Sequence, residues 1–212
     1  MLGSLPGLSL ALYPFSLFVT LIHESWHAML TVVTGGTVRS LEISPDLSGA
    51  IVHRGGVEAL IAPAGYIGAS VTGAAILVTP LRLSRWLVGG LAVFPLLALV
   101  LCHPASAFTA IWCIAFIAGL GVAAWRLNGR LLALLQVFLG VEVALNALRD
   151  VTTLIFLSGS NVHMQTDAQN MAQALFGPSF LWSALWTLIS VLVLSAALYR
   201  IGTGDLRRLR GH

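Results

Sequence analysis

The chain has 212 residues, of which 58% are hydrophobic and only 9% are charged. Soluble domains carry about 25% charged residues, so the composition excludes a soluble globular protein and indicates an integral membrane protein. The net charge of +3 comes from eleven basic residues, all arginine, that are scattered at the ends of apolar stretches. We therefore expect the protein to be embedded in a lipid bilayer and to have no nucleic-acid partner.

The first apolar stretch, residues 8–34, is long enough for a membrane-spanning helix, which needs about 20 residues. A short polar segment follows it. Alternating side chains over residues 37–44 predict a strand, a turn is expected at Pro45-Asp46, and a second strand is expected around residues 49–52. The first span is thus expected to lead into a short β-hairpin.

Five further apolar stretches are long enough to cross a membrane. They cover residues 57–78, 86–102, 105–125, 131–157 and 178–199. The predicted fold class is an all-α polytopic membrane protein with about six transmembrane helices and a short β-hairpin after the first. Residues 1–200 are expected to form a single transmembrane domain, and residues 201–212 a basic cytoplasmic tail.

The arginines predict the orientation of the spans. Most of them lie between the second and third spans, between the fourth and fifth, and in the tail, whereas Arg39 and Arg54 lie in the hairpin segment together with Glu42, Asp46 and Glu58. Because positively charged loops stay on the cytoplasmic side, both termini are expected in the cytoplasm. The hairpin and the polar loop at residues 158–174 would then face the outside.

The first span carries the motif His23-Glu24-Ser25-Trp26-His27, an H-E-x-x-H pattern in an otherwise apolar segment. On a helix, residues four apart share a face, so His23 and His27 can bind one metal ion. Glu24 lies beside them, where it can act on a metal-bound water. Ionisable groups are costly at membrane depth and usually functional there. The motif therefore predicts a zinc site within the bilayer.

A catalytic zinc needs a third protein ligand, usually His, Asp or Glu. The fifth span offers a polar face whose members are Glu142, Asn146, Arg149 and Asp150. The helical rise places Asp150 and His23 in the same half of the membrane, whereas Glu142 comes out about 12 Å shallower than Asp150. Asp167, in the following loop, is the competing ligand, although Thr166-Asp167 also fits the start of a helix.

At these residues the chain resembles the M50 (site-2 protease) metallopeptidases, and in particular the compact bacterial M50B-like branch. The resemblance covers about residues 17–186. It is carried by the H-E-x-x-H motif, Thr34-Gly35-Gly36, Ser48-Gly49, Ala64-Gly65-Tyr66-Ile67-Gly68, the segment from Leu145 to Val151, and Thr166-Asp167-Ala168.

The resemblance implies one Zn²⁺ per chain, held by two histidines and one aspartate, with the glutamate as general base. The ligands here would be His23, His27 and Asp150. Asp150 is followed by Val151, where the family pattern usually has glycine, so Asp167 stays the alternative third ligand. The resemblance also implies transmembrane protein substrates and a bacterial inner (cell) membrane location.

The hypothesis is a zinc-dependent intramembrane endopeptidase that performs regulated intramembrane proteolysis. In it, Glu24 takes a proton from a zinc-bound water, which is the nucleophile. Asn146 or Arg149 would hydrogen-bond the substrate or the developing oxyanion. The alternatives are a non-proteolytic membrane metal-binding or transport protein and a degenerate, protease-like scaffold. The sequence leaves the substrate and the oligomeric state open.

Overall fold

The computed structural model describes residues 6–159 and 166–210. Most of them are helical. The helices are α1 (Pro6–Val33), α2 (Glu58–Ile61), α3 (Ala64–Val78), α4 (Ser84–Gly90), α5 (Val93–Leu101), α6 (Ala107–Arg126), α7 (Gly129–Gly159), α8 (Asp167–Ala174) and α9 (Ser179–Arg210), with a 3-10 turn η2 at Leu81–Leu83. The strands are β1 (Thr37–Ile43), β2 (Gly49–Arg54) and β3 (His103–Pro104).

Five helical segments of the described chain are long and apolar enough to cross a membrane, which makes this an integral membrane protein. They correspond to the second to sixth predicted spans, and their bounds are Glu58–Val78, Leu81–Leu101, Ala107–Arg126, Gly129–Ser158 and Ser179–Thr203. Helix α1 is not among the five. With 28 residues it has the length of a span, and its second half carries the H-E-x-x-H motif. The prediction of a polytopic all-α membrane protein with a hairpin is confirmed.

Two of the predicted spans are interrupted rather than continuous. Helix α2 stops at Ile61, and α3 starts after Pro63, which occupies the N-cap position of α3. Proline lacks a backbone donor and fits the start of a helix better than its interior. Helices α4 and α5 are likewise separated by Leu91-Ala92, directly after Gly89-Gly90. The residues at both breaks, Ala62-Pro63 and Leu91-Ala92, keep right-handed helical backbone angles.

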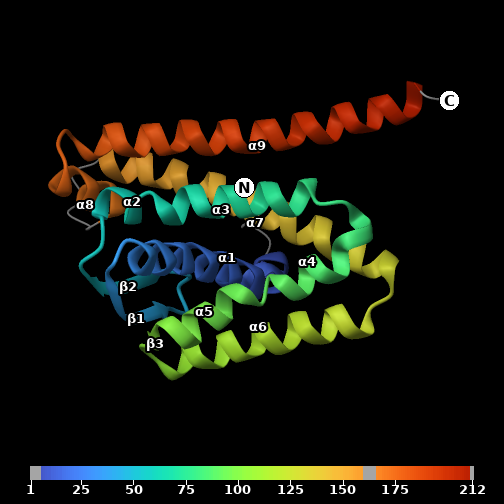
Figure 1. The fold of residues 1–212 in the computed structure, drawn as a ribbon, viewed down its shortest axis with the longest axis horizontal. Helices are drawn as coiled ribbons and strands as arrows, with labels where there is room; N and C mark the ends of the chain where they lie inside the picture. The colour runs from blue at the N-terminus through green and yellow to red at the C-terminus, as the bar shows by residue number, and fades with distance from the viewer. Residues whose placement is uncertain (1–5, 160–165, 211–212) are drawn as a thin grey trace.

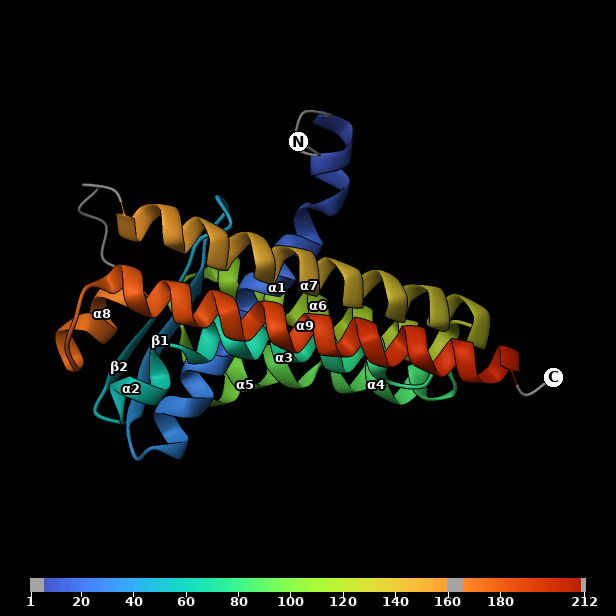
Figure 2. The same cartoon turned by 90° about the horizontal axis from the view of Figure 1, so that it is seen from above.

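The long helices α3, α7 and α9 pack against one another along the long axis of the molecule (Figure 1). The sheet, α2 and α8 gather at one end, and α9 ends at the other (Figures 1 and 2). The hairpin and α8 thus lie at the same end. The first turns of α1, which has Pro14 in its interior, project away from the other helices (Figure 2).

The predicted hairpin forms, and it gains a third strand. Strand β1 pairs antiparallel with β2, with Leu41 opposite Ile51, and an irregularity interrupts the register between Val38 and Ser40. The two-residue strand β3 pairs parallel with β1 on the other side, which gives the order β2-β1-β3. A strand this short between two apolar spans leaves no alternation in the sequence, so it was not predicted. In this order β2 lies at one edge of the sheet.

Side chains of α1 hold the hairpin turn in place. The Tyr13 hydroxyl donates to the carbonyl of Pro45 at 2.8 Å, and the Thr20 hydroxyl donates to that of Leu47 at 2.9 Å. Within the turn, the Asp46 carboxylate accepts hydrogen bonds from the hydroxyl and amide of Ser48, which lower the pKa of Asp46. These bonds fix β2 against the motif-bearing half of α1.

Gln136 of α7 offers a test of how the helices are joined at the end opposite the sheet. Its buried amide donates to the carbonyls of Ile76 and Thr79 at 2.9 and 2.7 Å and accepts from the Ser84 hydroxyl at 2.6 Å. Gln136→Leu removes the donor to both carbonyls, and we expect a loss of about 1–3 kcal/mol in stability. Thermal unfolding in detergent measures it. Val137→Leu, at the exposed neighbouring position, is the control. Equal Tm values for the two variants would contradict a stabilising role of the Gln136 hydrogen bonds.

Candidate metal centre

A cavity of about 610 Å³ opens at the end of the molecule that carries the sheet and α8. Helices α1, α2, α3, α7 and α8 line it together with β2 and the hairpin turn. All three ionisable residues of the H-E-x-x-H motif reach it from α1. The cavity therefore joins the motif to segments far apart in the sequence.

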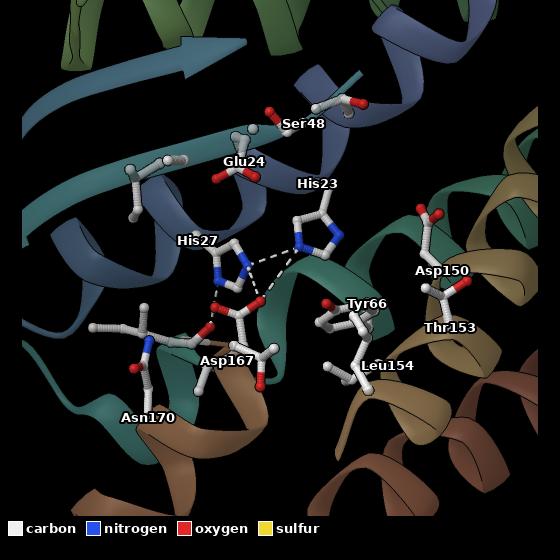
Figure 3. A pocket seen from close by; sticks show the side chains of 18 of the residues that line it. His23, Glu24, His27, Ser48, Tyr66, Asp150, Thr153, Leu154, Asp167 and Asn170 are labelled. Carbon is white, nitrogen blue, oxygen red and sulfur yellow. Dashed lines mark hydrogen bonds and ion pairs between the residues drawn. The ribbon is translucent and has the colours of Figure 1, made fainter. Parts of the chain in front are cut away.

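Three potential ligands converge at the wall of this cavity (Figure 3). The Nε2 atoms of His23 and His27 lie 3.0 Å apart. The Oδ2 atom of Asp167 lies 3.7 Å from the former and 3.5 Å from the latter. Ligands about 2.0–2.1 Å from a tetrahedral zinc are about 3.3 Å from one another. The three atoms therefore fit one zinc ion.

The tautomer of His27 also suits a metal ligand. Its Nδ1 atom lies 2.7 Å from the carbonyl oxygen of Ile61, the last residue of α2. Because a carbonyl oxygen only accepts hydrogen bonds, Nδ1 must be the donor. Nε2 of the neutral ring then keeps its lone pair, which is the arrangement found in metal-bound histidines.

Asp167 is the first residue of α8 and is placed by the cap of that helix. The Thr166 hydroxyl accepts a hydrogen bond from the backbone N–H of Gln169, and the Gln169 side-chain oxygen accepts one from the backbone N–H of Thr166. The two bonds form a capping box. Asp167 is therefore not the N-cap residue, and its carboxylate turns to the histidines. Desolvation alone would raise the pKa of Asp167, but His27 and His23 outweigh it and hold this pKa below its usual range.

Two glycines permit the close approach of other elements to the motif. A Cβ atom on Gly65, in the first turn of α3, would overlap the Nε2 atoms of His23 and His27. A Cβ atom on Gly49, in β2, would lie 2.6 Å from a carboxylate oxygen of Glu24. Any larger residue would have to displace the motif, so these two backbone segments form the walls that face it.

Glu24 occupies the position expected of a general base. It is only 6% exposed, and that exposed part faces the cavity. Figure 3 shows its carboxylate between the hairpin and His27, on the same side as the converging ligands. Glu24 itself is not part of the three-residue group.

The structure places the other predicted residues differently. Asp150 lines the same cavity from α7, but it lies on the far side of His23 from His27 and outside the three-residue group (Figure 3). Asn146 donates to the Glu142 carboxylate at 3.1 Å, and Arg149 donates to Asn146 at 3.3 Å. Neither Asn146 nor Arg149 is among the cavity-lining residues.

Tyr66 is a cavity residue to which the sequence assigned no role. Its ring stands edge-on to that of His23, with the centroids 4.5 Å apart, and it stacks on Trp186 with the centroids 5.9 Å apart. The signal in the sequence was its place in Ala64-Gly65-Tyr66-Ile67-Gly68, one of the segments that carry the family resemblance. Its contact with His23 depends on how α1, α3 and α9 pack.

Comparison with protein families gives one result. A family model described as Peptidase M50B-like matches residues 8–197, which include every residue of the site described above. No curated protein and no solved structure gives a match.

Gly65→Ala tests whether the close approach of α3 shapes the metal centre. The added methyl group must push apart the two histidine rings, so we expect the variant to fold but to lose most of its capacity to bind Zn²⁺. Metal content after reconstitution and dialysis measures this. Gly119→Ala on α6 is the control, because its Cβ would meet open space. Full metal binding by Gly65→Ala would contradict the geometry.

Proposed function

The chain belongs to the Peptidase M50B-like family, and we propose on this basis that it is a zinc-dependent intramembrane endopeptidase acting on membrane-embedded proteins. One observation carries the proposal. His23, His27 and Asp167 converge at a cavity that also contains the Glu24 carboxylate, in a chain of apolar helices. Metal-assisted hydrolysis requires protein ligands that hold the metal ion and a nearby group that can accept a proton from water.

We assign the zinc to His23, His27 and Asp167. The separations of 3.0–3.7 Å between their ligand atoms support this set. Asp150, the ligand that the family resemblance suggests, would have to approach from beyond His23, so we treat it as the alternative. Zinc, when bound, supplies Lewis acidity that polarises a carbonyl and lowers the pKa of water toward about 7. All other functions fall to side chains of the protein.

Glu24 would be the general base. It follows His23 directly on α1, so its carboxylate is presented at the same edge of the cavity as the ligands. Glu24 would accept a proton from the attacking water and pass it to the departing amine, so that the glutamate ends each turnover as it began. Hydrolysis then yields one carboxylic acid and one amine from each peptide bond.

Strand β2 is the surface on which we propose that the substrate lies. Its outer edge has no partner strand among the described residues, and its residues from Gly49 to Ile51 line the cavity. A peptide must be extended to be cut, because the carbonyls of a helix are occupied by its own hydrogen bonds. Such a peptide can add to β2 as a further strand, close to Glu24.

We also propose the location that the family resemblance suggests, the inner (cell) membrane of a bacterium, with both termini in the cytoplasm as the arginines indicate. The turns between α3 and α4 and between α6 and α7 lie at the end opposite the cavity (Figure 1). Residues 1–200 would be the transmembrane domain and residues 201–212 the cytoplasmic tail. Helix α9 continues without a break from Ser179 to Arg210, so the tail begins as an extension of the last span.

The metal content of the purified protein tests the ligand assignment. We expect about one zinc per chain in the wild type, and loss of it in His23→Ala and Asp167→Ala, because two ligands hold zinc far less tightly than three. Asp150→Ala should keep the zinc. Elemental analysis of detergent-purified protein gives the stoichiometry. If Asp150→Ala loses zinc and Asp167→Ala keeps it, Asp150 is the third ligand in place of Asp167. A wild type that cannot bind zinc would refute the proposal.

Glu24→Gln separates a protease from a metal transporter or a scaffold. The variant should retain zinc but cleave at least about 10²-fold more slowly, because amide nitrogen cannot accept the proton. The assay uses vesicles containing the protein and a panel of single-pass peptides with a glycine or proline in the outer half, and mass spectrometry locates the cut. Equal cleavage by the variant would exclude Glu24 as base. Zinc binding without any cleavage would favour the non-proteolytic alternatives.

A further inference from the structure

We propose that Tyr66 is a further catalytic residue, whose phenol donates a hydrogen bond to the oxyanion that forms on the scissile carbonyl. The inference rests on the proposed peptidase function. Hydrolysis of a peptide bond places negative charge on the carbonyl oxygen, and donors fixed in advance at that position are a major source of catalysis. The residues suggested for this role by the sequence, Asn146 and Arg149, do not line the cavity.

The ring of Tyr66 is held in place on two sides. It packs edge-on against His23 at an interplanar angle of 90°, and it stacks on Trp186, which is 1% exposed, at 25°. Its backbone begins α3 beside Gly65, whose missing Cβ lets this turn approach the histidine rings. The ring of Tyr66 therefore contacts one of the proposed metal ligands directly.

The Tyr66 hydroxyl is free to bind a substrate. Figure 3 shows it pointing toward the space between His23 and Asp167. No described residue forms a hydrogen bond with it, whereas the hydroxyl of Tyr13 donates to a carbonyl at 2.8 Å. Tyrosine hydroxyls in protein interiors usually find a partner. A phenol keeps its proton at neutral pH, so this one can donate to an oxygen in the cavity.

Other hydroxyls in the cavity are less suited to this role. Those of Thr20 and Ser48 donate to the hairpin turn, and that of Thr166 caps α8. The Thr153 side chain lies on α7 beside Asp150, beyond His23 (Figure 3). Tyr66 is thus the hydroxyl that reaches the side of the cavity where the three ligands converge.

In this mechanism Glu24 transfers the proton, and Tyr66 only donates a hydrogen bond. Water adds its oxygen to the carbonyl carbon and loses a proton to Glu24, and the carbonyl oxygen becomes an oxyanion. Tyr66 keeps its own proton and donates a hydrogen bond that strengthens as the charge grows. When the carbon–nitrogen bond breaks, the carbonyl re-forms and Glu24 returns the proton to the amine. Tyr66 therefore stabilises the transition state more than the bound substrate.

Tyr66→Phe tests the inference, because it removes the hydroxyl and keeps both ring contacts. The substrate is whichever single-pass peptide of the panel the wild type cuts fastest. We expect an unchanged zinc content, a KM close to the wild-type value, and a kcat lower by about 10²–10³-fold, as for loss of one oxyanion donor. Tyr199→Phe is the matched control, since Tyr199 is 73% exposed on α9; it should behave as the wild type.

Binding gives a readout that is independent of turnover. A phosphinic analogue of the same peptide carries a tetrahedral, negatively charged group in place of the scissile bond. Its Kd for Tyr66→Phe should rise about as much as kcat/KM falls, because both report on the transition state. The uncut peptide should bind equally to Glu24→Gln and to the double variant Glu24→Gln/Tyr66→Phe.

The outcomes distinguish this inference from the proposed function. Full cleavage and full analogue binding by Tyr66→Phe overturn the role of Tyr66 and leave the peptidase intact, provided that Glu24→Gln is inactive. Loss of zinc from Tyr66→Phe shows instead that the tyrosine acts by holding His23, which also overturns the inference. A wild type that cuts no peptide contradicts the proposed function and this inference with it.

Discussion

The candidate site depends on three potential ligand atoms from two separate helices that lie within 4 Å of one another. His23 and His27 come from successive turns of α1, but Asp167 comes from α8, 140 residues after His27. Water cannot stabilise such groups in an apolar interior, so each must find a partner in the protein. Ile61 provides one for His27, and the capping box of α8 aims the Asp167 carboxylate at both rings.

Small residues let the rest of the fold close around this group. Gly65 lets the start of α3 lie against the histidine rings, and Gly49 lets β2 lie against Glu24. The same two elements carry Tyr66 and the edge of the sheet. The residues that leave room for the motif therefore also bring a hydrogen-bond donor and a strand edge to it. This explains why glycines recur where the chain resembles a metallopeptidase.

Much of the fold follows from apolar length and local pattern. Five spans and the hairpin appear near their predicted positions, because a bilayer demands about 20 apolar residues and a strand demands alternation. The breaks at Pro63 and at Leu91-Ala92, and the pairing of β3 with β1, were not predicted. The pairing depends on contacts between segments about 60 residues apart, which leave no local signal. The breaks do have local causes in Pro63 and Gly89-Gly90, but a prediction from apolar length alone passes over them.

For the site, the sequence by itself determined the pair of histidines and the glutamate beside them, because helical spacing alone places His23 and His27 on one face. It could not choose between Asp150 and Asp167, since depth along a helix says nothing about which way a side chain turns. Tertiary structure decided that Asp167 lies with the histidines, that Asn146 and Arg149 lie outside the cavity, and that Tyr66 lies within it. Each of these depends on how α3, α7 and α8 pack around α1, because only packing fixes the distances between side chains of different helices.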